Sequence, residues 1–391
     1  MLTLLILLVL LNYLVETTIK VLNFKESKKP LHPTLANLYS ESEYQRSLEY
    51  SQANFTTSVA NSTYSVAILV VALLMGVFGA IDRWVREFTS SEILIAIIFF
   101  AIIFLASDLL DLPFDLYGTF VIEAKFGFNK TTAKTFIFDK IKGYLLGGVL
   151  GGGLLTLIIF IYQNSGGAFW ILGWLLLSLF SLVMFMFGTT LILPLFNKLK
   201  PLEDGELKDE ILKYCQQEGY SIGRLFVMDA SKRSSKANAF FAGLGKTKTI
   251  VLFDTLIEKL STREIMAVLA HEIGHYKKKH TLVGFIISAI QSLIIFAVLG
   301  WALQFPELSQ ALGSEKQSFH LAILAFFIIF SPLSMILDLF TNSYSRRNEY
   351  AADQFAKVTY DAEPLKTGLI RIATDSLANL SPHPLAVKIY A

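Results

Sequence analysis

The chain has 391 residues, of which 53% are hydrophobic and only 17% are charged. Its mean hydropathy is +0.53. Because a soluble enzyme carries about a quarter charged residues, this composition excludes an ordinary soluble enzyme and indicates a membrane protein. The net charge of +2 gives no sign of nucleic-acid binding. Cys215 is the only cysteine, which excludes an intrachain disulfide and a cysteine-based zinc cluster.

Apolar runs long enough to cross a bilayer, which takes about 20 residues, occur at seven places along the chain. They cover residues 1–22, 64–84, 92–112, 143–163, 168–196, 281–304 and 319–342. The first run lacks the basic start and the small-residue cleavage site of a signal peptide, so we interpret it as a retained helix. The sequence therefore predicts an all-α, multi-pass integral membrane protein with seven transmembrane helices.

Polar connections separate these runs and are very unequal in length. Residues 23–63 and 113–142 contain aromatic side chains, so we expect them to pack as helices against the membrane domain, while 164–167 reads as a tight turn. The resulting organisation has four parts. They are an N-terminal membrane domain of five helices (1–196), a hydrophilic insertion (197–280), transmembrane helices six and seven (281–342) and a C-terminal segment (343–391).

The hydrophilic insertion combines helical and strand patterns. We expect helices at 206–218 and around 271–275, strands at 222–229, 237–243 and 249–253, and a turn at 243–248. The sequence thus predicts a small α+β unit. If its second strand lies at an edge beside the site, an extended peptide could pair with Ala237, Asn238, Ala239, Phe240 and Phe241. A plain supporting sheet is an equally open interpretation.

Lysine and arginine are distributed unevenly between the two sides of the predicted bundle. The loops after the first, third and fifth runs and the C-terminal segment hold most of them, whereas the opposite loops hold little beyond Arg83, Arg86 and Lys316. The positive-inside rule therefore places the hydrophilic insertion in the cytoplasm and the N-terminus outside.

Residues 271–275 read HEIGH and suggest a metal-dependent hydrolase. His271 and His275 are four residues apart, so they share one face of a helix and can hold the same metal ion. Glu272 can reach a water on that ion and accept its proton. The motif favours a zinc hydrolase with Zn²⁺ as its cofactor.

A catalytic zinc site usually has three protein ligands, so one ligand remains to be found. Glu349 follows the seventh run on the same side as the histidines, and Asp353 shares its helical face and could bond the free nitrogen of a ligating histidine. The alternative is that both acids form a solvated helix face. His320 lies at the outer end of the seventh run and is excluded.

Two further histidines are weaker candidates. His280 is a rival ligand, but continuous helical rotation would point it away from the metal face, and we expect it to cap Lys277, Lys278 and Lys279. His383 could fold back and donate to a developing oxyanion, or it could be a loop histidine without a role.

Several segments occur together in one order along the chain. They are YGTFVIE (117–123), GFNK (127–130), LFNK (195–198), NAFFAG (238–243), IVLFDTL (250–256), HEIGH (271–275) and SRRNEYAAD (345–353). With these segments the chain resembles the integral-membrane type I CAAX prenyl protease family from about residue 40 to the end. One departure is Lys388, which stands about where that family usually has an arginine beyond the HP pair.

The resemblance implies seven helices around a water-filled chamber that contains the zinc site. It also implies removal of the terminal tripeptide from prenylated Cys-a-a-X proteins. His271, His275 and Glu349 would be the ligands and Glu272 the general base, with Asn238 and His383 as helpers of the substrate or transition state. We therefore expect a monomeric zinc endopeptidase that contacts membrane lipid and a peptide or protein substrate, which can be lipidated, and that does not bind nucleic acid.

Two other functions stay open at this point. One is a membrane quality-control metalloprotease with no need for a prenyl group. The other is a non-enzymatic transporter or receptor with seven helices, in which Asp108, Asp111 and Asp338 would form a polar pathway.

Overall fold

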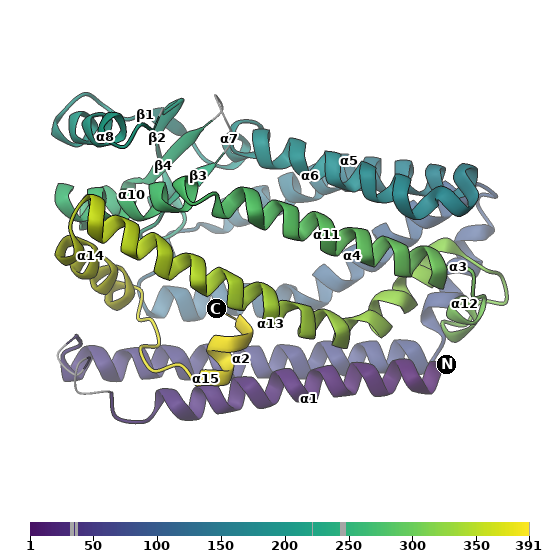
Figure 1. Ribbon diagram of the computed structural model, residues 1–391. Coiled ribbons are helices and arrows are strands. Elements are labelled where there is room, and N and C mark those ends of the chain that lie inside the picture. Colours follow the sequence, from purple (N-terminus) through teal and green to yellow (C-terminus); the bar gives the residue numbers. More distant parts are fainter. Residues whose placement is uncertain (32–34, 36–37, 221, 243–247, 391) are drawn as a thin grey trace.

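Long helices form most of the molecule and run roughly alongside one another, with a small sheet and several shorter helices at one end (Figure 1). The computed structural model describes residues 1–31, 35, 38–220, 222–242 and 248–390. The N-terminus lies at the end opposite the sheet (Figure 1). A membrane crossed by these helices would therefore separate the N-terminus from the sheet.

Six segments are long and apolar enough to cross a membrane within the described residues. They are Leu2–Ser27 (α1), Glu41–Leu74 (α2), Glu92–Glu123, Ala133–Phe196, His280–Ala302 (α11) and Phe319–Thr359 (α13). The third consists of α4 (Glu92–Tyr117) and a π-helix (Gly118–Glu123). The fourth holds α5 (Ala133–Ser165), α6 (Phe169–Leu191) and the short α7 (Leu193–Phe196). Gly166, with φ of 51°, begins the 3-10 turn between α5 and α6, where the sequence predicted a turn.

The second apolar run was predicted with the wrong limits. α2 begins at Glu41, where Ser40 and Glu43 form a capping box, and it ends at Leu74. The polar first half of α2 contains neither Gly nor Pro, so the helix extends well before the apolar run that marks the membrane. Gly76 then adopts the left-handed conformation, and the predicted end of the span belongs to a separate helix, α3 (Val77–Arg86).

The last long helix contains candidate site residues as well as an apolar, membrane-crossing segment. α13 continues past the predicted limit at residue 342 to Thr359, so Glu349 and Asp353 are on the same rigid helix as the apolar residues. Two shorter helices follow, α14 (Ala362–Asp375) and α15 (Pro384–Tyr390).

The sheet has four strands in the order β1-β2-β4-β3. Three of them, β2 (Arg224–Met228), β3 (Ala239–Ala242) and β4 (Thr249–Phe253), lie within the predicted ranges. The prediction missed β1 (Leu199–Pro201), because three residues that end in proline give no strand pattern. β3 lies at one edge of the sheet. The predicted turn at 243–248 lies outside the described residues except for Lys248.

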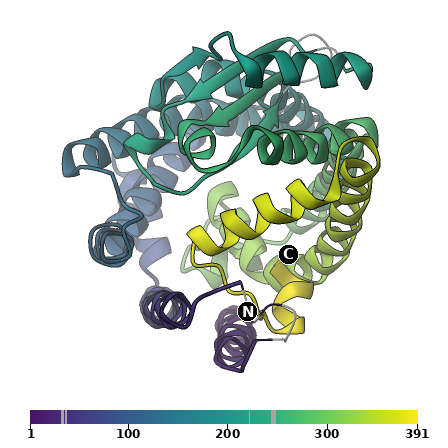
Figure 2. The same ribbon diagram turned by 90° about the vertical axis from the view of Figure 1, so that its left-hand side faces the viewer.

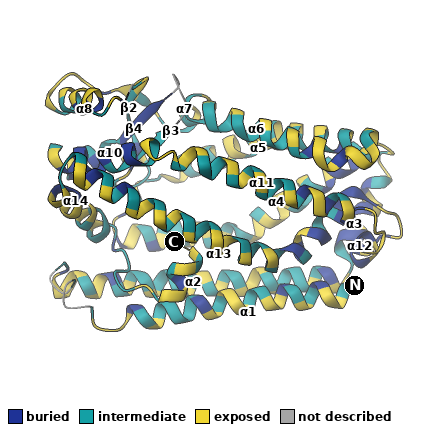
Figure 3. Cartoon of the chain, viewed as in Figure 1, coloured by how far each residue is buried: buried dark blue, intermediate teal, exposed yellow. Residues whose placement is uncertain are grey.

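The helix that bears the HEIGH motif, α10 (Thr262–Lys277), lies in the core of this end of the molecule. Its Ile265, Met266, Leu269 and Ile273 are buried and belong to the same cluster as residues of β4, α8 (Glu206–Gln217) and α9 (Asp254–Lys259). Figure 3 shows this burial along α10. Cys215 of α8 is buried there too, and burial raises the pKa of its thiol to about 12, so it behaves as an inert apolar residue.

Buried polar residues at the opposite end of the bundle are paired, although Nδ1 of His320 has no hydrogen-bond partner among the described residues. His320 is fully buried, and its Nε2 lies 2.9 Å from Oδ1 of Asp82. Within the helices, Lys140 lies 2.8 Å from Asp108 and 3.1 Å from Asp115, and Asp111 accepts a hydrogen bond from Ser65. The ion pairs of Asp108 and Asp115 give these acids a structural role.

Candidate active site and metal centre

The local sequence explains why α10 is a well-defined platform. Ser261 and Glu264 form a capping box, in which the Ser261 backbone N–H donates to the Glu264 carboxylate at 2.9 Å. Arg371 of α14 lies 3.2 Å from the same carboxylate. Since one face of α10 is buried against the sheet and α8, its other face presents His271, Glu272 and His275.

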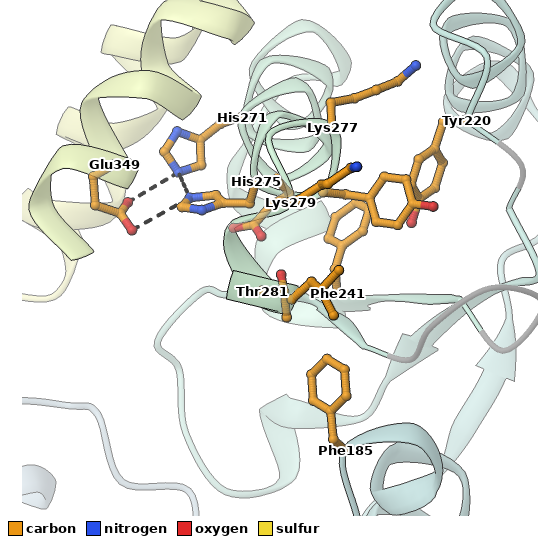
Figure 4. A pocket seen from close by; sticks show the side chains of 12 residues that line it. Phe185, Tyr220, Phe241, His271, His275, Lys277, Lys279, Thr281 and Glu349 are labelled. Atoms are coloured by element: carbon orange, nitrogen blue, oxygen red, sulfur yellow. Dashed lines mark hydrogen bonds and ion pairs between the residues drawn. The ribbon is translucent and has the colours of Figure 1, made fainter. Parts of the chain in front are cut away.

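Two histidines of α10 and one carboxylate of α13 converge at one point (Figure 4). The Nε2 atoms of His271 and His275 are 3.1 Å apart. Oε2 of Glu349 lies 3.3 Å from Nε2 of His271, and Oε1 lies 3.5 Å from Nε2 of His275. The structure thus brings together the three residues that the sequence suggested as ligands.

The spacing of these atoms suits a shared metal ion. Two ligands at about 2.0–2.1 Å from a tetrahedral zinc are about 3.3 Å from each other, and the two Nε2 atoms are 3.1 Å apart. Each oxygen of the Glu349 carboxylate faces one of these nitrogens, at 3.3 and 3.5 Å. Burial lowers the pKa of His275, which favours the neutral imidazole that a metal requires. The residues present therefore fit a divalent cation.

Asp353 lies against the ring nitrogen of His271 that faces away from the convergence point. Nδ1 of His271 is 2.8 Å from Oδ1 of Asp353, one helical turn beyond Glu349 on α13. A proton on Nδ1 leaves Nε2 of His271 with its lone pair free for a metal.

His280 does not lie where helical rotation predicted. α10 ends at Lys277, Lys279 adopts the left-handed conformation with φ of 59°, and α11 begins at His280. This turn brings Nδ1 of His280 to 3.1 Å from Nδ1 of His275. The rotation argument was wrong about where His280 lies, because it assumed one continuous helix, but His280 is not among the three convergent residues. His280 contacts the side of His275 that is opposite Nε2.

Gly274 allows α10 and α13 to approach closely beside His271, His275 and Glu349. A Cβ atom at this position would lie 3.1 Å from Cβ of Phe355 and 3.2 Å from Cα of Ala352. The glycine inside the HEIGH motif therefore sets the separation of the helices that carry the three convergent residues.

A cavity of about 530 Å³ opens beside this cluster. His271, Glu272, His275 and Glu349 line its polar side, and Tyr220, Phe241, Tyr276 and Phe185 line its aromatic side (Figure 4). Burial raises the pKa of Glu272, which makes this carboxylate a stronger base than an exposed one. A second cavity of about 300 Å³ continues past His275 and His280 toward Asn348.

The remaining predicted site residues are less closely tied to the cavity. Phe241 of the predicted substrate strand lines it, whereas the Asn238 carboxamide accepts a hydrogen bond from the N–H of its neighbour Ala239 at 2.8 Å. The backbone N–H of His383 donates to Asn23 of α1 at 2.9 Å, and Nδ1 of His383 accepts from Leu385 at the start of α15. Asn238 and His383 keep their suggested roles as predictions only.

Comparisons with known proteins identify the family of the chain. Residues 20–198 match the family model described as CAAX prenyl protease N-terminal, five membrane helices, and residues 201–388 match peptidase family M48. The CAAX prenyl protease 1 homolog of Oryza sativa is 35% identical over 386 residues, covering 96% of this chain and 90% of that protein. CAAX prenyl protease 1 of Saccharomyces cerevisiae is 33% identical, with 92% and 85% covered.

A solved structure extends the agreement to the fold. The crystal structure of S. mikatae Ste24p superposes with a TM-score of 0.94 at 29% identity, covering 99% of this chain and 95% of that chain. Two family models and relatives above 30% identity together span nearly the whole chain. The chain belongs to the CAAX prenyl protease group of peptidase family M48 and is a multi-pass membrane metalloprotease that acts on peptide or protein substrates.

Proposed function

We propose that this metalloprotease uses Zn²⁺ and cleaves the carboxyl-terminal tripeptide from lipidated Cys-a-a-X proteins. The single observation that carries the proposal is the convergence of His271, His275 and Glu349 beside the base Glu272. The names of the relatives, CAAX prenyl protease 1, suggest the substrate class.

Each residue of the site has a separate role in this proposal. His271, His275 and Glu349 hold the metal, with Asp353 and His280 fixing the orientation of the two imidazoles. Bound Zn²⁺ supplies Lewis acidity to the site. Glu272 accepts a proton from the attacking water and passes it to the leaving amine of the scissile bond. β3 pairs with the extended peptide through its free edge.

We also propose the membrane arrangement given by the charge pattern. The end that holds the site faces the cytoplasm, and seven helices, with α5 and α6 counted separately, enclose a water-filled chamber that admits the substrate. The chain acts as a monomer in contact with membrane lipid.

Purified protein incubated with a farnesylated Cys-a-a-X peptide tests the proposal. Mass spectrometry should detect release of the tripeptide, chelation should abolish it, and added Zn²⁺ should restore it. Elemental analysis should find about one zinc per chain. Equal cleavage of the peptide without its farnesyl group would instead favour a quality-control protease, and no cleavage by the zinc-loaded protein would refute the proposal.

A further inference from the structure

A third cavity, called the lysine cavity below, has the chemistry of an anion receptor. It measures about 550 Å³ and lies between α1, α2, the segment before β3 and the linker after α14. Lys20 and Lys236 line it together with Asn23, Asn54 and Asn379, and none of its described lining residues is acidic. The stacked rings of Phe24 and Phe55, 4.3 Å apart, line it as well.

The two lysines are held differently. Lys236 lies 3.1 Å from Glu123 and 2.9 Å from the hydroxyl of Tyr50, which fixes its ammonium group at the cavity wall. Lys20 donates to the hydroxyl of Ser62 at 2.8 Å, and among the described residues no carboxylate pairs with it. The cavity therefore carries a positive charge that the described residues leave without an ionic partner.

The edge strand relates this cavity to the metal cluster. Phe241, late in β3, lines the cavity beside His271, His275 and Glu349, called the metal cavity below. Lys236 lies three residues before the first residue of β3 and lines the lysine cavity. A peptide paired antiparallel to β3, the more stable arrangement per residue, runs from the aromatic metal cavity toward Lys236. Its carboxyl-terminal end then points at the two lysines.

The C-terminal segment joins this cavity to the helix that carries Glu349. Asn23, which lines the cavity, accepts a hydrogen bond from the N–H of His383, and the Val387 carbonyl, four residues further, accepts one from Arg346 of α13 at 2.9 Å. Figures 1 and 2 both show α15 beside α1.

We propose that this cavity binds the free carboxylate at the end of the substrate, so that Lys20 and Lys236 favour substrates with a free carboxyl terminus. The inference rests on the proposed function. It also places the lipidated cysteine against Tyr220, Phe241 and Tyr276 in the metal cavity.

Two peptides of one sequence test the inference, a farnesylated peptide ending in Cys-Val-Val-Ala with a free carboxylate and the same peptide as a carboxamide. The protein should cleave the acid with a kcat/KM at least about tenfold above that of the amide. Lys20→Met and Lys236→Met should each raise KM for the acid and leave the amide nearly unaffected. Lys236→Arg should keep most of the preference.

Matched variants separate the possible outcomes. Lys25→Met removes the same charge from an exposed position of α1 that does not line the cavity, and it should leave the preference unchanged. Equal cleavage of acid and amide by the unaltered protein, or a preference that survives both lysine variants, overturns this inference alone. A preference lost instead in Lys277→Met or Lys279→Met, which line the metal cavity, would mean that the peptide runs in the other direction. Cleavage of neither peptide would refute the proposed function itself.

Discussion

Nδ1 of His280 lies 3.1 Å from Nδ1 of His275, while Nε2 of His275 faces Glu349 at 3.5 Å. Asp353 stands in the same relation to His271. Each histidine of the cluster thus has one nitrogen directed at the convergence point and the other in contact with a neighbouring side chain. Such partners fix the tautomer of a metal-binding imidazole.

His280→Ala should therefore weaken zinc binding about tenfold to a hundredfold. His280→Gln, which keeps an acceptor, should weaken it less. Competition with a chromophoric chelator measures the affinity directly, without any assay of proteolysis. Lys278→Ala, an exposed neighbour, serves as the control. An unchanged affinity in His280→Ala would exclude the positioning role.

Glu272→Gln should retain zinc and lose activity by about a hundredfold to ten-thousandfold, because the amide cannot accept the water proton. Tripeptide release and zinc content are measured on the same preparation. Glu258→Gln, on the exposed side of α9, should keep full activity. Full activity of the Glu272 variant would contradict its assignment as the base.

Gly274→Ala should push α10 and α13 apart, since the new methyl group would meet Phe355 and Ala352 at 3.1–3.2 Å. We expect a stability loss of about 1–3 kcal/mol together with weaker zinc binding. Thermal unfolding in detergent and chelator competition measure the two effects. Gly143→Ala, where no atom lies within 4 Å, should have neither effect.

Glu264→Gln should destabilise the start of α10 by about 0.5–2 kcal/mol at neutral pH. Burial alone would raise the pKa of Glu264, but the hydrogen bonds from Ser261 and the charge of Arg371 lower it below its usual 4.5. A lowered folded pKa contributes stability that is complete above pH 4.5 and is lost as the pH falls further. The difference in unfolding temperature between the unaltered protein and Glu264→Gln should therefore become smaller as the pH falls below 4.5. A constant difference would show that the carboxylate charge contributes nothing.

The sequence by itself determined much of the local structure. The helix expected around 271–275 and the strand expected at 249–253 are both present, because the pattern that predicts each of them involves only nearby residues. The HEIGH spacing placed both imidazoles on one helical face for the same reason. The polarity of the sequence was misleading at one place. The second apolar run was predicted to begin at residue 64, whereas helix α2 begins at Glu41.

Only the tertiary structure decided which distant residues meet. Glu349 and Asp353 reach the histidines because α13 continues as one helix and Gly274 lets it approach α10. His280 reaches His275 because a single left-handed residue, Lys279, redirects the chain, which a rotation of 100° per residue cannot foresee. The lysine-lined cavity joins residues 20, 54, 236 and 379, whose proximity depends on packing between elements far apart in the chain.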